Sequence, residues 1–208
     1  PAALYKFAKG GSMDQLATVP ALADYSSGFR RCAVHQQTQR TYAIGETDGG
    51  GRALVLLDTN LQVIATVEAV GVAPEEEDFD PLRDVAVHGD QVIVLTSNDH
   101  REGGSGLRLL DLDGRFVRTI AAGRFRNPWA LATSHGRALV IDDDVDDESR
   151  KGGKVLFVID IQSGDILQRF RVDLRGEIAA ILVDGDEIYI SCVNANEVVV
   201  LRYAGSEA

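Results

Sequence analysis

The chain of 208 residues is 45% hydrophobic, which suits one domain or two small ones with a sizeable core. Its 21 lysine and arginine residues against 32 aspartate and glutamate residues give a formal net charge of −11, which disfavours nucleic acid because binding to phosphates needs cationic contacts. No apolar run approaches the roughly 20 residues that span a bilayer, and no secretory signal is visible, so we expect no membrane insertion and leave the compartment open.

A hydrophobic pattern recurs about once every fifty residues, and each copy holds short runs of β-branched and aromatic residues between turn residues. First strands are predicted at 31–35, 84–88, 131–135 and 180–184. Second strands follow at 40–44, 91–95, 137–141 and 187–191, and third strands at 53–58, 107–111, 155–160 and 198–202. Fourth strands are predicted at 62–67, 116–120 and 166–172. The last copy has no fourth strand, and the segment 3–8 near the beginning of the chain supplies a spare one.

The turns between third and fourth strands share an aspartate. Asp58, Asp111 and Asp160 each end a third strand and precede residues typical of tight turns. Aspartate suits this position because its side chain accepts hydrogen bonds from backbone amides just ahead of it. These residues predict tight hairpin turns between the third and fourth strands.

Such a period is typical of repeat architectures, and four-stranded units predict an all-β protein with the fold of a β-propeller. We expect one domain with blades at about 29–69, 82–121, 128–173 and 177–203, the last completed by 3–9. Strands from both ends would then close a four-bladed ring and protect its edges. The alternative is part of a five- or six-bladed ring.

Three segments resemble the NHL-repeat consensus. They are the Gly-x-Phe-x-x-Pro run at 123–128, the turn at 111–116 and the strand with its following asparagine at 188–198. The first two repeats keep the strand plan without the Gly-x-Phe-x-x-Pro signature. The resemblance implies a β-propeller. Some NHL propellers bind RNA, which the net charge of −11 argues against here.

The two faces of the predicted propeller differ in their connections. First-to-second and third-to-fourth connections are short throughout. The other face carries the long connections, at 10–28, 47–51, 70–81, 97–106 and 142–153. Because long loops on a rigid scaffold commonly carry binding residues, we expect function on that face.

Two acidic runs lie in these long connections. We assign to a protein partner the residues Glu75, Glu76, Glu77, Asp142, Asp143, Asp144, Asp146 and Asp147. One alternative is a solvated loop without a partner. Calcium, which prefers six to eight oxygen ligands, is another, although the run at 142–148 lacks EF-hand spacing.

Arg124, Arg126 and Trp129 form a second group of candidate partner-binding residues beside the acidic run. Arginine and tryptophan are enriched at interaction hot spots. The alternative for Trp129 is packing between blades. The expected surface therefore combines acidic loops with a basic and aromatic patch.

Three histidines, His35, His88 and His135, occupy equivalent positions at the ends of the predicted first strands. Three histidines with an open position are a zinc pattern, but strand-end residues beside short turns explain them without a metal. Cys32 and Cys192 lie in apolar strands and are expected to be buried thiols, with a disulfide across the ring left open.

No nucleophile elbow, His-Glu-x-x-His motif or phosphate-binding glycine loop occurs in the chain. We therefore predict a non-enzymatic protein-binding or scaffold propeller without a cofactor, its oligomeric state left open. The alternative is a calcium-dependent hydrolase or lyase of the six-bladed propeller type, by analogy of fold. The first strands begin near Arg31, Asp84, Trp129 and Glu177, which form a poor ligand set for that metal.

Overall fold

A computed structural model describes residues 29–46, 51–67, 82–97, 105–143, 153–174 and 176–202 of the chain. These residues form antiparallel strands joined by turns. The strands are β1 (Phe29–Val34), β2 (Thr41–Glu46), β3 (Arg52–Leu57), β4 (Val63–Val67), β5 (Leu82–His88), β6 (Gln91–Thr96), β7 (Gly106–Asp111), β8 (Phe116–Ile120), β9 (Ala130–Ser134), β10 (Arg137–Asp143), β11 (Lys154–Asp160), β12 (Ile166–Val172), β13 (Glu177–Asp184), β14 (Glu187–Val193) and β15 (Glu197–Arg202). Within the described ranges, no helix has the length and apolarity to cross a membrane.

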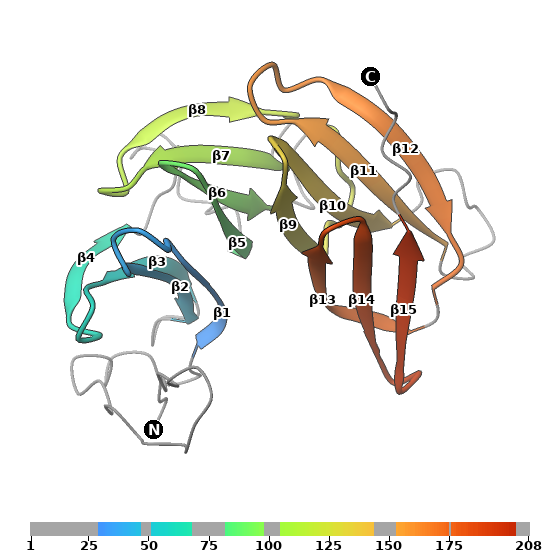
Figure 1. The fold of residues 1–208 in the computed structure, drawn as a ribbon, viewed down its shortest axis with the longest axis horizontal. Helices are drawn as coiled ribbons and strands as arrows, with labels where there is room; N and C mark the ends of the chain where they lie inside the picture. The colour runs from blue at the N-terminus through green and yellow to red at the C-terminus, as the bar shows by residue number, and fades with distance from the viewer. Residues whose placement is uncertain are drawn as a thin grey trace.

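Each sheet is built from strands that are consecutive in the sequence. Three sheets have four strands, in the orders β1-β2-β3-β4, β5-β6-β7-β8 and β9-β10-β11-β12, and the fourth sheet has β13-β14-β15. Figure 1 shows the four sheets fanned around a common centre, with β1, β5, β9 and β13 nearest to it. This arrangement confirms the predicted all-β fold of a β-propeller. We number the sheets as blades 1 to 4.

The innermost strands of successive blades pack in the order β1, β5, β9 and β13. The segment 3–8, expected to complete blade 4, lies outside the described residues. Among the strands that the structure describes, blade 4 therefore has three, and closure of the ring by the segment 3–8 stays a prediction.

The core lies between the blades. Tyr42 and Leu56 of blade 1 pack with Val92 and Leu110 of blade 2, and similar apolar clusters join blade 2 to blade 3 and blade 3 to blade 4. In blades 1 to 3, the second and third strands are buried on both faces, which explains their continuous apolar runs. Burial of this kind contributes roughly 25 cal/mol per Å² of apolar surface, so blade stacking is the main stabilising term.

The aspartate turns form as predicted. The carboxylate of Asp58 accepts hydrogen bonds from the amides of Asn60 and Gln62, both at 2.8 Å. Asp111 accepts from the amides of Asp113 and Arg115 in the same way, at 2.9 and 2.8 Å. Each aspartate thus stabilises a turn within its own hairpin.

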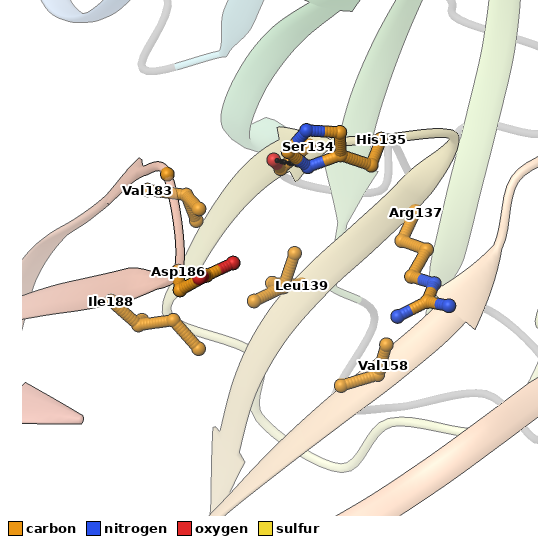
Figure 2. Close-up of a pocket in the computed structure, with 9 residues that line it drawn as sticks. Ser134, His135, Arg137, Leu139, Val158, Val183, Asp186 and Ile188 are labelled. Atoms are coloured by element: carbon orange, nitrogen blue, oxygen red, sulfur yellow. Dashed lines mark hydrogen bonds between the residues drawn. The ribbon is translucent and has the colours of Figure 1, made fainter. Parts of the chain in front are cut away.

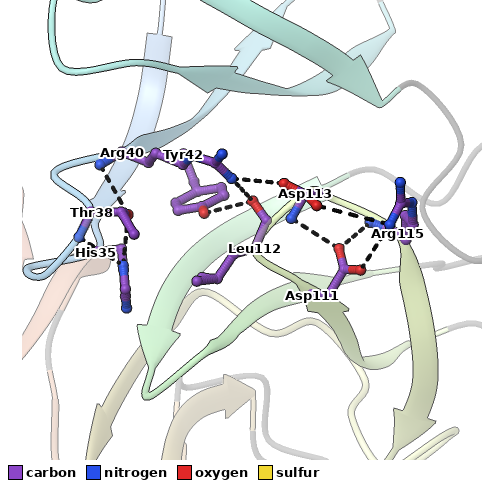
Figure 3. A network of polar contacts seen from close by, with 8 residues as sticks. All are labelled: His35, Thr38, Arg40, Tyr42, Asp111, Leu112, Asp113 and Arg115. Carbon is purple, nitrogen blue, oxygen red and sulfur yellow. Dashed lines mark hydrogen bonds and ion pairs between the residues drawn. The ribbon is translucent and has the colours of Figure 1, made fainter.

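Blades 1 and 2 are also tied together beside these turns (Figure 3). Tyr42 donates its hydroxyl proton to the carbonyl of Leu112 at 2.8 Å, and Arg40 Nη1 donates to the same carbonyl at 3.1 Å. Arg40 also pairs with Asp113 at 2.8 Å. The polar groups at this end of the ring are therefore largely engaged with one another.

Candidate functional site

The ring has two ends that differ in their connections. The short-turn edge holds the ends of the first strands and the aspartate turns. The long-connection edge holds the beginnings of the first and third strands. At the long-connection edge, a cavity of about 260 Å³ is lined by Arg30, Arg31, Arg52, Arg83, Pro128, Trp129 and Ile178. These residues, the arginine pocket, come from all four blades.

Bulges at the beginning of the first strands help to direct arginines into the pocket. The pairing of β1 with β2 shifts register between Phe29 and Arg31, which makes Arg30 the extra residue. The pairing of β5 with β6 shifts in the same way around Arg83. A bulge interrupts the alternation of side chains along a strand. Arg30 and Arg31, although adjacent in the sequence, therefore both line the cavity.

The guanidinium groups meet a small number of carboxylates. Glu46, at the end of β2, lies 2.5 Å from Arg30 Nε and 3.6 Å from Arg52 Nη2. Arg31 Nε lies 3.7 Å from Asp84, too far for a hydrogen bond. Arg31 Nε is buried and, within the described part of the chain, has no hydrogen-bond acceptor. Such a group is uncommon in folded proteins.

Positive charge is concentrated around Arg52. Burial lowers the pKa of this guanidinium, the charges of Arg30 and Arg83 lower that pKa further, and Glu46 acts in the opposite direction. Arg52 Nη1 also donates to the carbonyl of Leu82 at 2.9 Å, which ties blade 1 to blade 2. Arg52 therefore has a structural role as well as a place in the pocket.

Asp84 links blades 2 and 3 beneath the pocket. Its carboxylate oxygens accept hydrogen bonds from the amides of Val85 and Leu131, both at 2.8 Å. Burial raises the pKa of Asp84 to about 6, although these two hydrogen bonds and the charge of Arg31 act in the opposite direction. Asp84 thus holds the first strand of blade 3 in place.

Asp142 was predicted to contact a partner, and the structure places it inside the protein. Its side chain is fully buried at 0% exposure, and its carboxylate accepts hydrogen bonds from the amides of Arg126 and Asn127 at 2.8 and 2.7 Å. Burial raises the pKa of Asp142 to about 6. The prediction of a surface role is corrected for this residue, because its two carboxylate oxygens bind backbone amides of the loop that precedes β9.

Asp143 orients Trp129. It accepts hydrogen bonds from Trp129 Nε1 at 2.9 Å and from Asn127 Nδ2 at 2.8 Å, and it pairs with Lys154. Burial alone raises the pKa of Asp143, but these three donors together hold it below its usual range. Lys154 Nζ also lies 4.7 Å from the centroid of the Trp129 ring. Asp143 is therefore a supporting residue of the pocket wall.

The other predicted partner-binding residues divide into two groups. Arg124 and Arg126 are exposed next to this wall, whereas Trp129 is half-buried against the cluster between blades 3 and 4 and also lines the pocket. Trp129 thus combines the two alternatives, packing between blades and exposure to a cavity. The remaining predicted residues, Glu75, Glu76, Glu77, Asp144, Asp146 and Asp147, lie outside the described residues.

The three histidines do not form the shared metal site that their spacing suggested. His35 is buried, with its Nδ1 2.7 Å from Thr38 Oγ1, and His135 is exposed. Among described residues, three or more histidine, cysteine or acidic side chains nowhere gather in a metal-binding arrangement. Cys32 and Cys192 are both free thiols, and only Cys192 is buried as expected.

A second cavity, of about 250 Å³, lies between blades 3 and 4 at the short-turn edge. Figure 2 shows Val183 and Asp186 on one side of it and Arg137 and Val158 on the other, with Leu139 between them. Its walls carry both charge signs and several apolar side chains. This cavity lacks the excess of one charge that marks the arginine pocket.

The sequence assigned a binding role to none of the four pocket arginines. Trp129 was expected to bind a partner, Arg31 was named only as part of a poor ligand set for calcium, and Arg30, Arg52 and Arg83 had no role. One signal was present, because Arg30 and Arg83 each lie five residues before the equivalent histidines His35 and His88. The bulges that expose the arginines have no comparable signature in the sequence.

No family model and no curated protein sequence matches the chain. Solved structures do match. The chain is similar to hydrazine synthase of Kuenenia stuttgartiensis, with a TM-score of 0.57 and 15% identity over 84% of this chain and 51% of that one. It is also similar to the Dos1 propeller, with a TM-score of 0.54 and 13% identity over 84% of this chain and 44% of that one.

A third similar structure is PorZ, described as an essential surface component of the type-IX secretion system of Porphyromonas gingivalis. Its TM-score is 0.50 and its identity 16%, over 84% of this chain and 21% of PorZ. The chain therefore spans about half, or less, of the length of these structures. At such identities the similarity shows the β-propeller fold alone, and the NHL repeat remains a resemblance.

Proposed function

We propose that the chain is a non-enzymatic propeller that binds a partner protein through its long-connection edge. The observation that carries this proposal is the arginine pocket, where blades 1 and 2 contribute four arginines, blade 3 an indole and blade 4 an isoleucine to one cavity. Arginine and tryptophan are the residues most enriched at the energetic centres of protein interfaces. Because they converge from separate blades, a partner docked there would contact the whole ring.

The wall of the pocket is held in position before any partner arrives. Trp129 is fixed by its hydrogen bond to Asp143 and by Lys154 above its ring. Asp142 fixes the backbone of Arg126 and Asn127. An ordered wall loses less conformational entropy on binding, which favours affinity.

The rim of this surface is polar in our proposal. Arg124 and Arg126 belong to it, together with the acidic residues Glu75, Glu76, Glu77, Asp144, Asp146 and Asp147 of the long connections. Rim charges of this kind steer association and select partners more than they add affinity. Asp142 and Asp143 are left out of the contact surface, because they support the pocket from within.

The alternative of a calcium-dependent hydrolase or lyase finds less support. A metal at the ring axis on this edge would lie among the guanidinium groups of Arg30, Arg31, Arg52 and Arg83. The positive charge of a metal ion and that of the guanidinium groups repel each other, and in a partly buried site water screens this repulsion only weakly. The chemistry of the pocket favours anions over cations.

Affinity capture with two matched variants tests the proposed function. The first variant carries Asp144→Asn, Asp146→Asn and Asp147→Asn on the long-connection side. The second carries Asp165→Asn, Asp184→Asn and Asp186→Asn, three exposed residues of the short-turn edge, and changes the net charge equally. Immobilised wild type and variants are incubated with the same cell extract, and retained proteins are identified by mass spectrometry.

We expect the long-connection variant to lose, by roughly tenfold, a protein that wild type and the short-turn variant both retain, since rim charges act mainly on association. Identical retention by all three proteins would contradict the acidic rim. Loss caused by the short-turn variant alone would place the binding surface at the opposite edge of the ring.

A further inference from the structure

We propose that the arginine pocket is a carboxylate-binding site that receives an acidic group of the partner, either an aspartate or glutamate side chain or a C-terminal carboxylate. This inference rests on the proposed function and adds the chemistry of the group that is recognised. The sequence assigned binding to acidic loops and to Arg124, Arg126 and Trp129, and of these residues only Trp129 lines the pocket.

The geometry of the pocket supports an anionic ligand. Each guanidinium presents five N–H donors in a planar fork. The side chain of Arg31 is 31% exposed, and its Nη1 donates to the carbonyl of Arg30 at 2.9 Å, which leaves other N–H groups of the fork. Arg30 is 55% exposed and pairs with Glu46 through its Nε. Both arginines therefore have donor groups to offer to a ligand in the cavity that they line.

The rim of the pocket already binds a carboxylate of this chain. Oε1 of Glu46 lies between Arg30 Nε, at 2.5 Å, and Arg52 Nη2, at 3.6 Å. The same pairing, repeated by an incoming carboxylate near Arg31, requires no new type of contact. Arginine suits this task because its fork matches the two carboxylate oxygens and remains charged at all physiological pH values.

The pocket also has an apolar side. Trp129, Pro128 and Ile178 line it opposite the strands that supply the arginines. A ligand that fits both sides has an anionic tip and an apolar neighbour, as in an acidic residue flanked by leucine. Free inorganic anions would use the arginines alone and gain nothing from the indole.

Net charge restricts the ligand further. The whole chain carries −11, so a long polyanion such as nucleic acid is repelled by most of the surface. Screening limits charge interactions to about 8 Å at physiological salt, so a single carboxylate inside the pocket experiences chiefly the nearby arginines. The arrangement therefore favours isolated acidic groups over polyanions.

The single tryptophan of the chain makes the proposal directly measurable. Trp129 lines the pocket, so its fluorescence reports on binding there. Four probes are titrated into the full chain. They are Ac-Leu-Glu-Leu-NH₂ with a side-chain carboxylate, Ac-Leu-Leu-Leu-OH with a terminal carboxylate, the neutral Ac-Leu-Gln-Leu-NH₂, and inorganic phosphate. We expect a saturable change with a carboxylate peptide and none with the neutral one.

Two double variants remove equal charge from different places. Arg30→Gln with Arg31→Gln alters the pocket, and Arg115→Gln with Arg202→Gln alters side chains that are 78% and 80% exposed elsewhere. Because charge-assisted hydrogen bonds are lost, we expect the pocket variant to weaken peptide binding about tenfold or more. The surface variant should bind as wild type does. Thermal unfolding of both variants shows whether the fold is intact.

If the pocket variant fails to fold, Arg31→Lys, which keeps the charge and loses the fork, replaces it, and a several-fold weakening is expected. Response to the side-chain probe identifies an internal acidic residue as the recognised group, and response to the terminal probe identifies a chain end. No saturable response to either carboxylate peptide, equal binding by the pocket variant, or tighter binding of phosphate would overturn the proposal. Partner capture that persists despite such a failure would leave the proposed function standing and move its recognition site outside the pocket.

Discussion

The two edges of the ring hold cavities of similar volume, about 250 Å³ and 260 Å³, yet their charged groups are arranged differently. At the short-turn edge, carboxylates such as that of Asp111 accept hydrogen bonds from backbone amides of their own turns. Arg40 and Tyr42 donate to a backbone carbonyl of the next blade. At the long-connection edge, Asp84 and Asp142 are buried beneath a surface to which arginines are directed. Local turns satisfy their own polar groups, whereas at the long-connection edge side chains from separate blades converge on one cavity.

Removal of Asp142 should have the largest effect on stability. Asp142→Ala leaves the amides of Arg126 and Asn127 without their acceptor, and each such loss costs about 1–3 kcal/mol. We expect the free energy of unfolding, measured by urea denaturation at pH 7, to fall by about 3 kcal/mol. The matched change Asp165→Ala, at an exposed residue of the short-turn edge, should alter it by less than about 0.5 kcal/mol. Equal losses of stability from Asp142→Ala and Asp165→Ala would contradict the view that buried carboxylates stabilise the long-connection edge more than exposed ones stabilise the short-turn edge.

Titration of Asp84 should have the next largest effect on the free energy of unfolding. Burial raises the pKa of Asp84 to about 6, above its unfolded value of 3.8, so the folded state binds more protons between these values. Its contribution to stability is therefore present at low pH and is lost as pH rises through about 6. Asp84→Asn removes this titration, and its amide group also cannot accept both backbone N–H groups that Asp84 binds.

The variant should consequently be more destabilised, relative to wild type, at pH 4.5 than at pH 7.5. We expect the loss of unfolding free energy caused by Asp84→Asn to be about 2 kcal/mol larger at pH 4.5 than at pH 7.5. Urea denaturation of both proteins at both pH values checks this. A difference that is independent of pH, or that grows toward pH 7.5, would show that Asp84 does not titrate as its burial implies.

A smaller effect is expected at the short-turn edge. Tyr42→Phe removes the hydroxyl that donates to the carbonyl of Leu112 across blades 1 and 2. That carbonyl keeps the hydrogen bond from Arg40, so we expect the unfolding free energy to fall by only about 0.5–1 kcal/mol. Thermal denaturation measures it. A loss as large as that of Asp142→Ala would show that the edges depend equally on single polar groups.

Exposed ion pairs of the aspartate turns should matter least. Arg115 lies 4.0 Å from Asp111 and 3.8 Å from Asp113, and its side chain is 78% exposed. Exposed pairs contribute about 0–1 kcal/mol, so Arg115→Ala should change stability by less than about 0.5 kcal/mol. Denaturation at low and high salt should give the same result for this variant. A salt-dependent loss would reveal a stronger charge network at the short-turn edge than the geometry indicates.

Much of the fold could be predicted because it depends on local patterns. The predicted strand at 107–111 is β7, Gly106–Asp111, and the predicted turn aspartates Asp58 and Asp111 bind the amides ahead of them. In blades 1 to 3, the second and third strands are buried on both faces, so their apolar runs are long and easily recognised. Outer strands were predicted as well, but not that Leu167 and Phe170 of β12 would be 47% and 42% exposed.

The site could be predicted only in part, because it depends on register and on contacts between blades. Trp129 was identified from the motif before β9, and the long-connection side was chosen from loop lengths. Asp142 was misassigned to the surface, because an acidic run shows charge but not which residue continues a strand inward. Arg30 and Arg83 were missed because a bulge directs them into the pocket.

Arginine footprinting compares the two edges in one sample and tests the central claim most directly. The full chain is treated with an arginine-specific dicarbonyl reagent, with and without Ac-Leu-Glu-Leu-NH₂ or Ac-Leu-Leu-Leu-OH, and modification is quantified by mass spectrometry. We predict that at least one peptide slows modification of Arg30 and Arg31 severalfold and leaves Arg115 unchanged. Modification rates that neither peptide changes at any of the three residues, or protection of Arg115 alone, would contradict a carboxylate-binding site in the arginine pocket.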